Sequence, residues 1–424
     1  MRRLLVLTLL SAVVTQSLWA QVPAKLSEED VIRLALDRNE ANAITRNQLK
    51  QAELRLKKAR SYLFPTLTAN ASVQKLYVLP EKRLPGGLQI NSGEVTLSQP
   101  IYTFGRLGSG IEIAKLDKDI TANAVKATRA EIVRAAKQIY YNAVYNKHVL
   151  KIAEESLANA NRNKSALGER VSFGRINQND NIKMQADVAS RKPLLHEATR
   201  GYESAIQDLS YFLNVEVEEI KELDGDLFDV PSALLVERPV NDFVDVQAAL
   251  HNRRLSAARE ELAKSDFMPT LSAFASYLPR HTPSSISLPG VLMTDTAAIG
   301  LRLDFELPLG GAKSYERRER SLDLNNAQLT VNRVLRESSK QQKSLIQQYN
   351  TLEKKKQSLQ DAVDVANRSY KVALASFRNG SISQLQLNDS ELLLTNNKIS
   401  FAQNLLQMKV LQTELERLQT EGKN

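Results

Sequence analysis

The residue types that usually carry out chemistry are few in this chain. It has no cysteine, and its histidines are widely separated and lack the spacing of metal ligands. They are His148, His196, His251 and His281. The glycine-rich stretch at 105–110 resembles a phosphate-binding loop, but it lacks the Gly-Lys-Ser/Thr ending that holds a nucleotide. We therefore predict a protein that is not an enzyme and that needs no cofactor and no metal ion.

The start of the chain differs in character from the rest. Two arginines precede an apolar stretch from Leu4 to Val14, and a small residue follows at Ala20. This pattern predicts a secretory signal peptide over residues 1–20, cut after Ala20 or alternatively after Ala24. A membrane anchor is the competing interpretation, but the apolar run is shorter than the roughly 20 residues of a spanning helix. Because no cysteine follows the cut, we expect no lipid anchor.

The formal net charge of +9 raises the question of a nucleic-acid partner. Lysine and arginine are, however, interspersed with aspartate and glutamate along stretches that have a helical pattern. Such mixing is typical of helix faces that contact water. Together with the predicted export signal, it indicates that no nucleic acid is bound.

An internal repeat organises the chain. The segment Leu63–Ser72 matches Phe267–Ser276, which lies 204 positions later. The segment Gly174–Gln178 matches Gly380–Gln384 at an offset of 206. Two matches in the same order at nearly the same offset indicate a duplicated unit. We predict a first structural repeat at 21–225, a linker at 226–240 and a second repeat at 241–424, intertwined in one domain.

Each repeat contains two stretches in which apolar and polar residues alternate, as in a strand with two different faces. The clearest are Thr66–Gln74 and Ile299–Leu307, and weaker ones lie near 95–101 and 271–277. In the stretch Ile299–Leu307, polar residues alternate with Ile299, Leu301, Leu303 and Phe305. These polar residues are Arg302, Asp304 and Glu306. The loops within each pair are expected at Lys75–Gly93 and Pro279–Asp295.

The helices predicted between these strands are unusually long. No glycine and no proline occurs from Ala312 to Asn379 or from Ile111 to Leu167. A 3,4 spacing of mostly apolar residues runs from Val331 to Phe377, with polar exceptions at Ser338, Gln342 and Lys356. This spacing is typical of a coiled-coil seam. A return helix is expected at Ser381–Glu421, after a turn at Gly380.

Four two-faced strands in an exported protein form either a soluble sheet or part of a barrel to which several chains contribute. In a bilayer every backbone polar group must be paired, so a sheet has to close into a barrel. Single-chain barrels begin at about 8 strands. A trimer contributing four strands per chain would close, with Arg302, Asp304 and Glu306 facing the lumen. We therefore predict a mainly α protein with a transmembrane β portion, and each repeat as a long coiled-coil helical hairpin plus a two-strand β-hairpin.

Five further segments resemble the TolC-like outer membrane efflux protein family over nearly all of the mature chain. They are Leu26–Leu36, the strand entry Phe64–Leu67 with its second copy, Gln99–Arg106, Pro308–Gly311 and Phe377–Ser383. The resemblance implies a homotrimer with a 12-stranded β-barrel in outer-membrane lipid and a periplasmic α-helical tunnel. It also implies a Gram-negative host, a periplasmic adaptor (membrane fusion) protein and an inner-membrane pump of the RND or ABC type.

The resemblance also assigns residues at the inner end of the tunnel. Acidic residues six and nine positions after each turn glycine narrow the entrance in the family, which points to Asp180 and Asp389, with Gln386 as a departure. A tyrosine and an arginine close the entrance in some members; Phe377 and Ile382 stand there in this chain. These lack the hydroxyl and the charge, so closure is expected to rely on apolar packing. The expected adaptor-docking tip is Phe173, Gly174, Ile176, Gly380 and Ile382.

Three functions remain open from the sequence. The first is the exit duct of a tripartite efflux system for small molecules. The second is the exit duct of a type I protein secretion system. The third is a periplasmic structural or adaptor coiled-coil protein, which is disfavoured because this chain places strands between two helical hairpins.

Overall fold

A computed structural model describes residues 23–76, 88–171, 178–225, 227, 235–281, 295–306 and 308–422. The predicted signal peptide lies outside these ranges, as do most of the predicted linker and parts of the loops between strands. The chain divides into two compact units. The hairpin unit comprises Met1–Asn39, Ala135–Ser232 and Leu352–Val410, and the sheet unit comprises Glu40–Arg134, Ala233–Thr351 and Leu411–Asn424. Each unit takes segments from both halves of the chain, so the division into two repeats stays a prediction.

Most of the described residues are helical, as predicted. The helices are α1 (Glu28–Arg38), α2 (Glu40–Ser61), α3 (Arg106–Val171), α4 (Gln178–Leu213), α5 (Val244–Ser265), α6 (Ala312–Arg378) and α7 (Gln384–Leu418). The strands are β1 (Lys25–Leu26), β2 (Thr66–Leu76), β3 (Leu88–Tyr102), β4 (Glu222–Leu223), β5 (Thr270–Leu278), β6 (Arg280–His281) and β7 (Thr296–Asp304). Among the described residues, no helix has a run both apolar enough and long enough to cross a bilayer.

Helix α3 begins at Arg106, where the backbone N–H of Leu107 donates to the Thr103 hydroxyl, and it includes two early glycines. Three predicted boundaries were wrong, and the first two concern the loops between strands. Strands β2 and β3 extend into the predicted loop Lys75–Gly93 and pair as far as Leu76 and Leu88. Likewise β6, inside the predicted loop Pro279–Asp295, pairs with β3.

The third error concerns the end of the last strand. β7 ends at Asp304, so the alternation of faces does not extend to Phe305 or Glu306. The Lys313 ammonium group donates to the backbone carbonyl oxygens of Glu306, at 2.6 Å, and of Asp266, at 2.8 Å. These bonds fasten the chain after β7 to the end of α5. Glu306 therefore lies beyond the sheet, and its predicted place in the lumen does not follow from the strand pattern.

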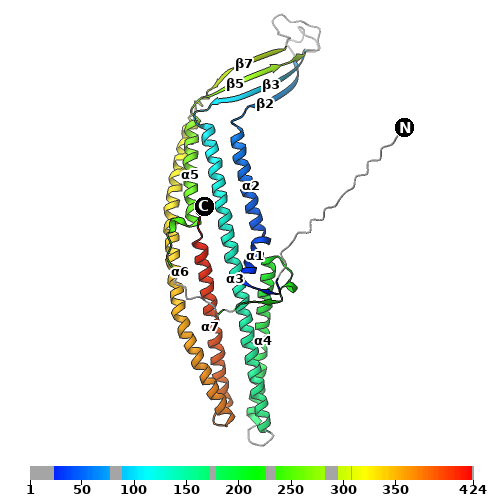
Figure 1. The fold of residues 1–424 in the computed structure, drawn as a ribbon, viewed down its shortest axis with the longest axis vertical. Helices are drawn as coiled ribbons and strands as arrows, with labels where there is room; N and C mark the ends of the chain where they lie inside the picture. Colours follow the sequence, from blue (N-terminus) through cyan, green and yellow to red (C-terminus); the bar gives the residue numbers. More distant parts are fainter. Residues whose placement is uncertain are drawn as a thin grey trace, which may run out of the picture. The chain divides into compact units, whose positions relative to one another are not determined.

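In the sheet unit, one antiparallel sheet lies at the end of α2, α3, α5 and α6 (Figure 1). Its strands follow the order β2-β3-β5-β7, and β3 pairs with β5, so the hairpins of the two halves of the chain join in the middle. Pro65 and Pro269 lie between each helix and its strand, as predicted, because proline cannot continue a helix. Among the described residues, the outer strands β2 and β7 each have one neighbouring strand.

The register gives the sheet two chemically different faces. Residues directly opposite one another in antiparallel strands share a face, and successive residues alternate. One face is mainly apolar and comprises Leu67, Ala69, Ala71, Val73, Val95, Leu97, Leu271, Ala273, Ala275, Tyr277, Ala297, Ile299, Leu301 and Leu303, together with Gly93 and the polar Lys75, Asn91 and Gln99. Ile299 is 89% exposed and Leu301 67%. The described part of the chain thus leaves this apolar face open.

The opposite face is mainly polar. It comprises Thr66, Thr68, Asn70, Ser72, Ser92, Glu94, Thr96, Ser98, Thr270, Ser272, Phe274, Ser276, Ala298, Gly300, Arg302 and Asp304. Phe274 and Leu278 also lie on this face, and Phe274 covers Gly300, where a Cβ atom would come within 3.1 Å of the ring. The Arg302 guanidinium lies 4.9 Å from the same ring centroid. The phenylalanine thereby fills the gap left by glycine and supports the arginine through a cation–π contact.

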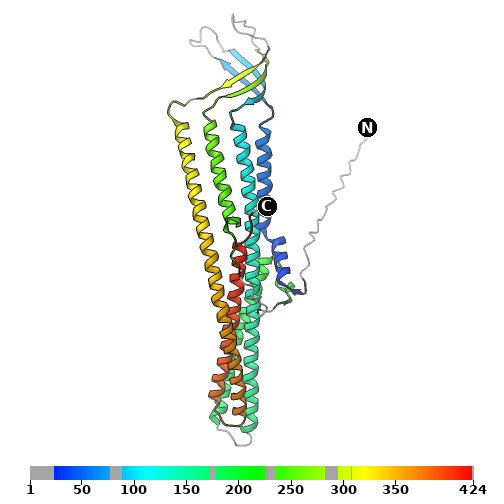
Figure 2. The same ribbon diagram turned by 60° about the vertical axis from the view of Figure 1, so that its left-hand side comes forward.

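In the hairpin unit, α3 runs beside α4 and α6 beside α7 (Figures 1 and 2). The amide of Asn404 on α7 donates to the backbone carbonyl of Leu352 on α6 at 3.1 Å. The short strands β1 and β4 pair in parallel next to these helices. The Lys147 ammonium group donates to the Leu223 carbonyl oxygen at 2.8 Å, and the Tyr140 hydroxyl donates to that of Asp224. These contacts hold the N-terminal segment and the segment after α4 on α3.

The predicted coiled-coil seam of α6 is confirmed by burial. Every position of the 3,4 pattern from Val331 to Phe377 is buried or half-buried. The polar exception Gln342 has a structural reason, because its side-chain amide accepts from the Arg238 N–H at 3.2 Å and donates to the Arg238 carbonyl at 3.1 Å. The Gln419 side chain donates to the same Gln342 oxygen at 3.0 Å. Gln342 thus satisfies backbone groups of the segment that leads into α5.

Candidate functional site

The second helical turn has the geometry of a glycine-terminated helix end. Gly380 has φ +80, in the left-handed region that glycine adopts without strain. The Ser381 N–H donates to the Ser376 carbonyl at 2.9 Å and the Gly380 N–H to the Phe377 carbonyl at 3.0 Å. These bonds form the paired closure typical of a helix that stops at glycine. Gly380 therefore ends α6, as its place in the sequence predicts.

The first helical turn is described only in part. Phe173, Gly174 and Ile176 of the predicted docking tip lie outside the described residues. Asp180 belongs to the first turn of α4, but its side chain lies outside the described set. The roles of these residues stay predictions.

Gln386 forms a capping box at the start of α7. Its side-chain oxygen accepts from the Ser383 N–H at 2.9 Å, and the Ser383 hydroxyl accepts from the Gln386 N–H at 3.4 Å. This reciprocal pair satisfies two N–H groups that a helix start leaves without partners. The glutamine that stands here in place of an acidic residue thus caps the start of α7. Asp389, three residues on, is exposed at the surface of α7.

Phe377 and Ile382 join an apolar cluster directly behind the turn. Phe377 is 9% exposed, and Ile382 packs against the same cluster. The buried members are Met184, Ala366, Tyr370, Ala373, Phe377, Leu387 and Leu394. Met184 is on α4, whereas the others are on α6 and α7, so the cluster connects the two helical hairpins. Closure of the entrance by this packing stays a prediction.

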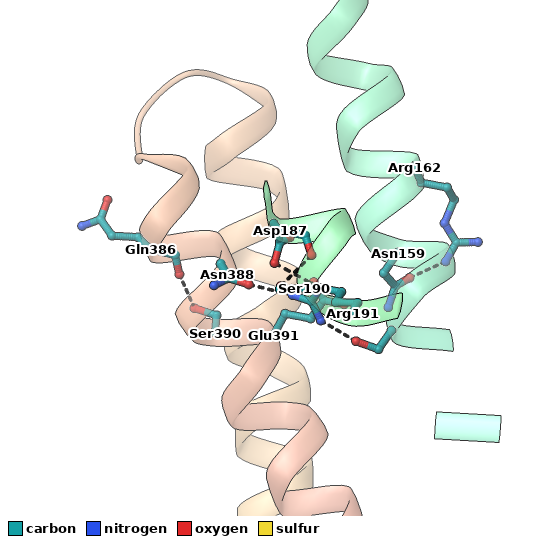
Figure 3. Close-up of polar contacts among 10 residues, drawn as sticks. Asn159, Arg162, Asp187, Ser190, Arg191, Gln386, Asn388, Ser390 and Glu391 are labelled. Atoms are coloured by element: carbon teal, nitrogen blue, oxygen red, sulfur yellow. Dashed lines mark hydrogen bonds and ion pairs between the residues drawn. The ribbon is translucent and has the colours of Figure 1, made fainter. Parts of the chain in front are cut away.

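A buried charged network comes after the apolar cluster along α4 and α7. Figure 3 shows its polar contacts. The side chains of Arg191 on α4 and Glu391 on α7 are each 3% exposed, with Nη2 and Oε2 3.2 Å apart. Arg191 also contacts Asp187 at 3.1 Å and donates to Asn388 at 2.6 Å. A further hydrogen bond goes to the Ser156 hydroxyl on α3. One guanidinium thus joins three helices.

Our interpretation of the sequence missed this network. Arg191 and Glu391 each occupy a position of 3,4 spacing among buried neighbours, Met184 and Val188 on α4 and Leu387 and Leu394 on α7. A charged residue at a position where the pattern requires an apolar one was the available signal. It was obscured because charges of both signs are frequent along the helices.

The surroundings of Glu391 alter its acidity. Burial raises the pKa of Glu391 above its ordinary value, the nearby Asp187 carboxylate raises it further, and Arg191 opposes both. Burial also raises the pKa of Tyr370, with a contribution from the Glu391 charge. The network can therefore hold helices together and respond to protons. Among the described residues, no group of three or more acidic or histidine side chains could hold a metal ion.

The remaining predicted site residues belong to the sheet unit. Arg302 and Asp304 share the polar face of β7, and Asp304 pairs in register with Thr270. Glu306 lies after the strand. The predicted lumen set is thus reduced to two residues with a defined face.

Comparison with known proteins places this geometry in a family. The profile of the outer membrane efflux protein family matches residues 31–215 and 232–419. The cobalt-zinc-cadmium resistance protein CzcC of Cupriavidus metallidurans is 27% identical over 164 residues. That alignment covers 38% of this chain and only 38% of CzcC.

Solved outer membrane channels have the same fold. The Campylobacter jejuni channel CmeC superposes with a TM-score of 0.80 at 15% identity, over 94% of this chain and 87% of that one. The Vibrio cholerae outer membrane protein VceC gives 0.77 at 16% identity, over 93% and 97%. The predicted resemblance is confirmed, and the family and its structural neighbours are channels rather than enzymes. This chain belongs to the outer membrane efflux protein family.

Proposed function

We propose that this protein is the outer-membrane exit duct of a tripartite efflux system, which exports small molecules across the periplasm and the outer membrane. The two-faced sheet with open edges is the observation that carries the proposal. Its apolar face has the chemistry of a lipid-contacting surface and its polar face that of a water-filled lumen. Family membership supports the assignment to efflux.

A homotrimer would solve the problem of the sheet edges. β2 and β7 are the outer strands, and an unpaired strand edge inside a bilayer leaves polar backbone groups without partners. Pairing β7 of one chain with β2 of the next would close the sheet with 12 strands. The lengths are suitable, because β5 and β7 each have 9 residues and a transmembrane strand needs about 9–11. Arg302 and Asp304 would then face the lumen.

The proposed partners are those that the family resemblance implies. We place the contact with a periplasmic adaptor at the tip of Phe173, Gly174, Ile176, Gly380 and Ile382, and the entrance at Asp180 and Asp389. The energy would come from an inner-membrane pump of the RND or ABC type. The host would be a Gram-negative bacterium. Export of a protein by a type I secretion system is the alternative use of the same duct.

The similarity to CzcC favours one class of small cargo. That relative is named for resistance to cobalt, zinc and cadmium. We therefore include divalent metal ions among the candidate substrates, beside drugs and bile salts.

Deletion of the gene tests the proposal. We expect the deletion strain to become more sensitive to at least one class in a panel of drugs, bile salts and metal salts, and the plasmid-borne gene to restore resistance. Loss of a secreted protein with unchanged sensitivity would favour the type I alternative. Cell fractionation provides the second measurement: recovery in the soluble periplasm would contradict a membrane channel and favour a periplasmic coiled-coil protein.

A further inference from the structure

The seam between α4 and α7 has a charged centre. Met184 and Val188 precede Arg191 on one face of α4, and Leu387 and Leu394 flank Glu391 on α7. All of these residues are buried. Because a 3,4 spacing repeats along both helices, the pattern is that of a coiled-coil seam in which an ion pair replaces one apolar layer.

We propose that Arg191 is the positioning residue that holds α4 against α7 and thereby keeps the two helical hairpins together in the closed form of the entrance. The inference rests on the proposed channel function and assigns a residue to its closure. In this proposal the closing contact lies within the helical hairpins. It is farther from the turns than Asp180 and Asp389, the residues predicted to narrow the entrance.

The contacts of Arg191 require its particular shape. Nε and Nη2 contact carboxylates on two helices, Asp187 on α4 and Glu391 on α7. Its terminal nitrogens also donate to Ser156 on α3 and Asn388 on α7. A guanidinium offers five donors in a planar fork, whereas a lysine ammonium group is a single point charge. Lysine at this position could not make all four contacts.

The charge balance makes the connection reversible. Two carboxylates, Asp187 and Glu391, face one buried guanidinium. A buried ion pair gives less net stability than well-packed apolar residues, but removing one partner is strongly destabilising. A seam built in this way is specific when closed and can separate without exposing a continuous apolar surface. If the seam only had to stabilise the fold, leucine at these positions would give more stability than the ion pair.

A second ion pair between the hairpins provides a matched control. The Lys398 ammonium group on α7 lies 3.0 Å from the Glu155 carboxylate on α3. Its side chains are 36% and 47% exposed, so water screens the pair and its contribution is small. Loss of Lys398 should therefore leave the hairpins together.

The test measures conductance of the full-length protein in planar bilayers for Arg191→Met, Arg191→Lys, Glu391→Leu, the double variant Arg191→Met/Glu391→Leu, and Lys398→Met. We expect Arg191→Met to shift the ratio of closed to open entrance by on the order of a hundred-fold and to raise the conductance. Glu391→Leu should leave the entrance closed, because Asp187 still pairs with Arg191 and no buried carboxylate is left without a partner. Arg191→Lys should resemble Arg191→Met, and the double variant should return toward the closed state.

Unchanged conductance in folded Arg191→Met would overturn the proposal. A lowered melting temperature of that variant at unchanged conductance would indicate a merely structural role for Arg191. Restoration of closure by Arg191→Lys would likewise contradict the need for the guanidinium fork.

A measurement independent of channel activity separates this proposal from the proposed function. The chain has no native cysteine, so spin labels can be placed at Lys183→Cys on α4 and Leu385→Cys on α7, both exposed positions. In detergent, Arg191→Met should broaden and lengthen the label–label distance, and Lys398→Met should not. An unchanged distance would contradict the role of Arg191 even if the protein conducts, whereas a changed distance without conductance would contradict only the channel.

Discussion

At the scale of single residues, Glu391 shows how burial can make a helix contact respond to pH. Its pKa is raised above the ordinary value of 4.5, chiefly by burial and further by Asp187, against the attraction of Arg191. From α3, Asn159 and Arg162 also act on it in the direction of a lower pKa, and Tyr370 faces it from α6. The closed seam therefore binds a proton more tightly than an open, hydrated one.

The sign of the pH dependence follows from this difference. Between 4.5 and the raised pKa, the closed seam holds a proton that the open one has lost. Closure is thus favoured as the pH falls toward 4.5 and is weakened as the pH rises through the raised pKa. We predict that the conductance of the wild-type protein decreases on acidification and that Glu391→Gln, permanently neutral, largely removes this dependence. Conductance measured across this pH range provides the check.

The control for this prediction is Glu155→Gln, which neutralises a more exposed acid of the same unit. It should retain the wild-type pH profile. If Glu391→Gln also retained that profile, another group would have to carry the response, and Asp187 would be the first candidate because it contacts the same guanidinium.

At the scale of secondary-structure elements, periodic patterns predicted most of what the structure contains. The seam of α6 and the alternation in β2 and β7 could be read because burial on one side imposes a period on the residue types. The end of β7 could not, since the Lys313 bonds to the backbone carbonyls of Glu306 and Asp266 determine it. A single side-chain contact of this kind leaves no period in the sequence to detect.

The same limit explains the polar residues inside the seams. Gln342 and Arg191 interrupt apolar patterns, and from the sequence each looks like an imperfection of the helix. In the structure Gln342 satisfies the backbone at Arg238, and Arg191 joins α3, α4 and α7. The helix end at Gly380 was thus predictable from the sequence, and the roles of the turn residues stay predictions, whereas the network behind the turn required three-dimensional contacts.

The two faces of β7 allow a sharp test of the barrel. Ile299 belongs to the apolar face and Ala298, its neighbour, to the polar one. A lysine on the lipid face costs about 2–4 kcal/mol near the bilayer midplane, whereas lumen positions tolerate charge. We predict that Ile299→Lys strongly reduces the amount of assembled trimer in the outer membrane and that Ala298→Lys assembles normally. The trimer band on unheated gels of membrane fractions measures both.

Equal assembly of these two variants would contradict the assignment of the apolar face to lipid. Loss of both would indicate that β7 tolerates no lysine at all, for instance because Ala298 lies beside the Phe274-covered Gly300 on the polar face. Thr68→Lys, on the polar face of β2, would then serve as the second control.

At the scale of the whole molecule, a trimer would place three copies of each entrance residue around one axis. Three copies of an exposed carboxylate around one axis make a ring that attracts cations and disfavours anions. Asp389 is exposed on α7, near the turn at Gly380, and Asp180 is in the first turn of α4. The sequence of one chain carries no periodic signal for its contacts with other copies of the chain or with cargo. The rings of Asp180 and Asp389 are therefore predicted from the family resemblance alone.

We predict that Asp180→Asn combined with Asp389→Asn lowers the preference for cations and weakens block by divalent or trivalent cations. The physical reason is the loss of up to six negative charges at one constriction, two from each chain of a trimer. The reversal potential in a salt gradient across a planar bilayer measures the preference, and titration of the blocking cation measures the second effect. Asp364→Asn, at an exposed position of α6 farther from the turn, is the matched control and should change neither quantity. An unchanged reversal potential together with unchanged block would place the selective constriction elsewhere along the channel, and the polar face of the sheet with Arg302 and Asp304 would become the next position to test.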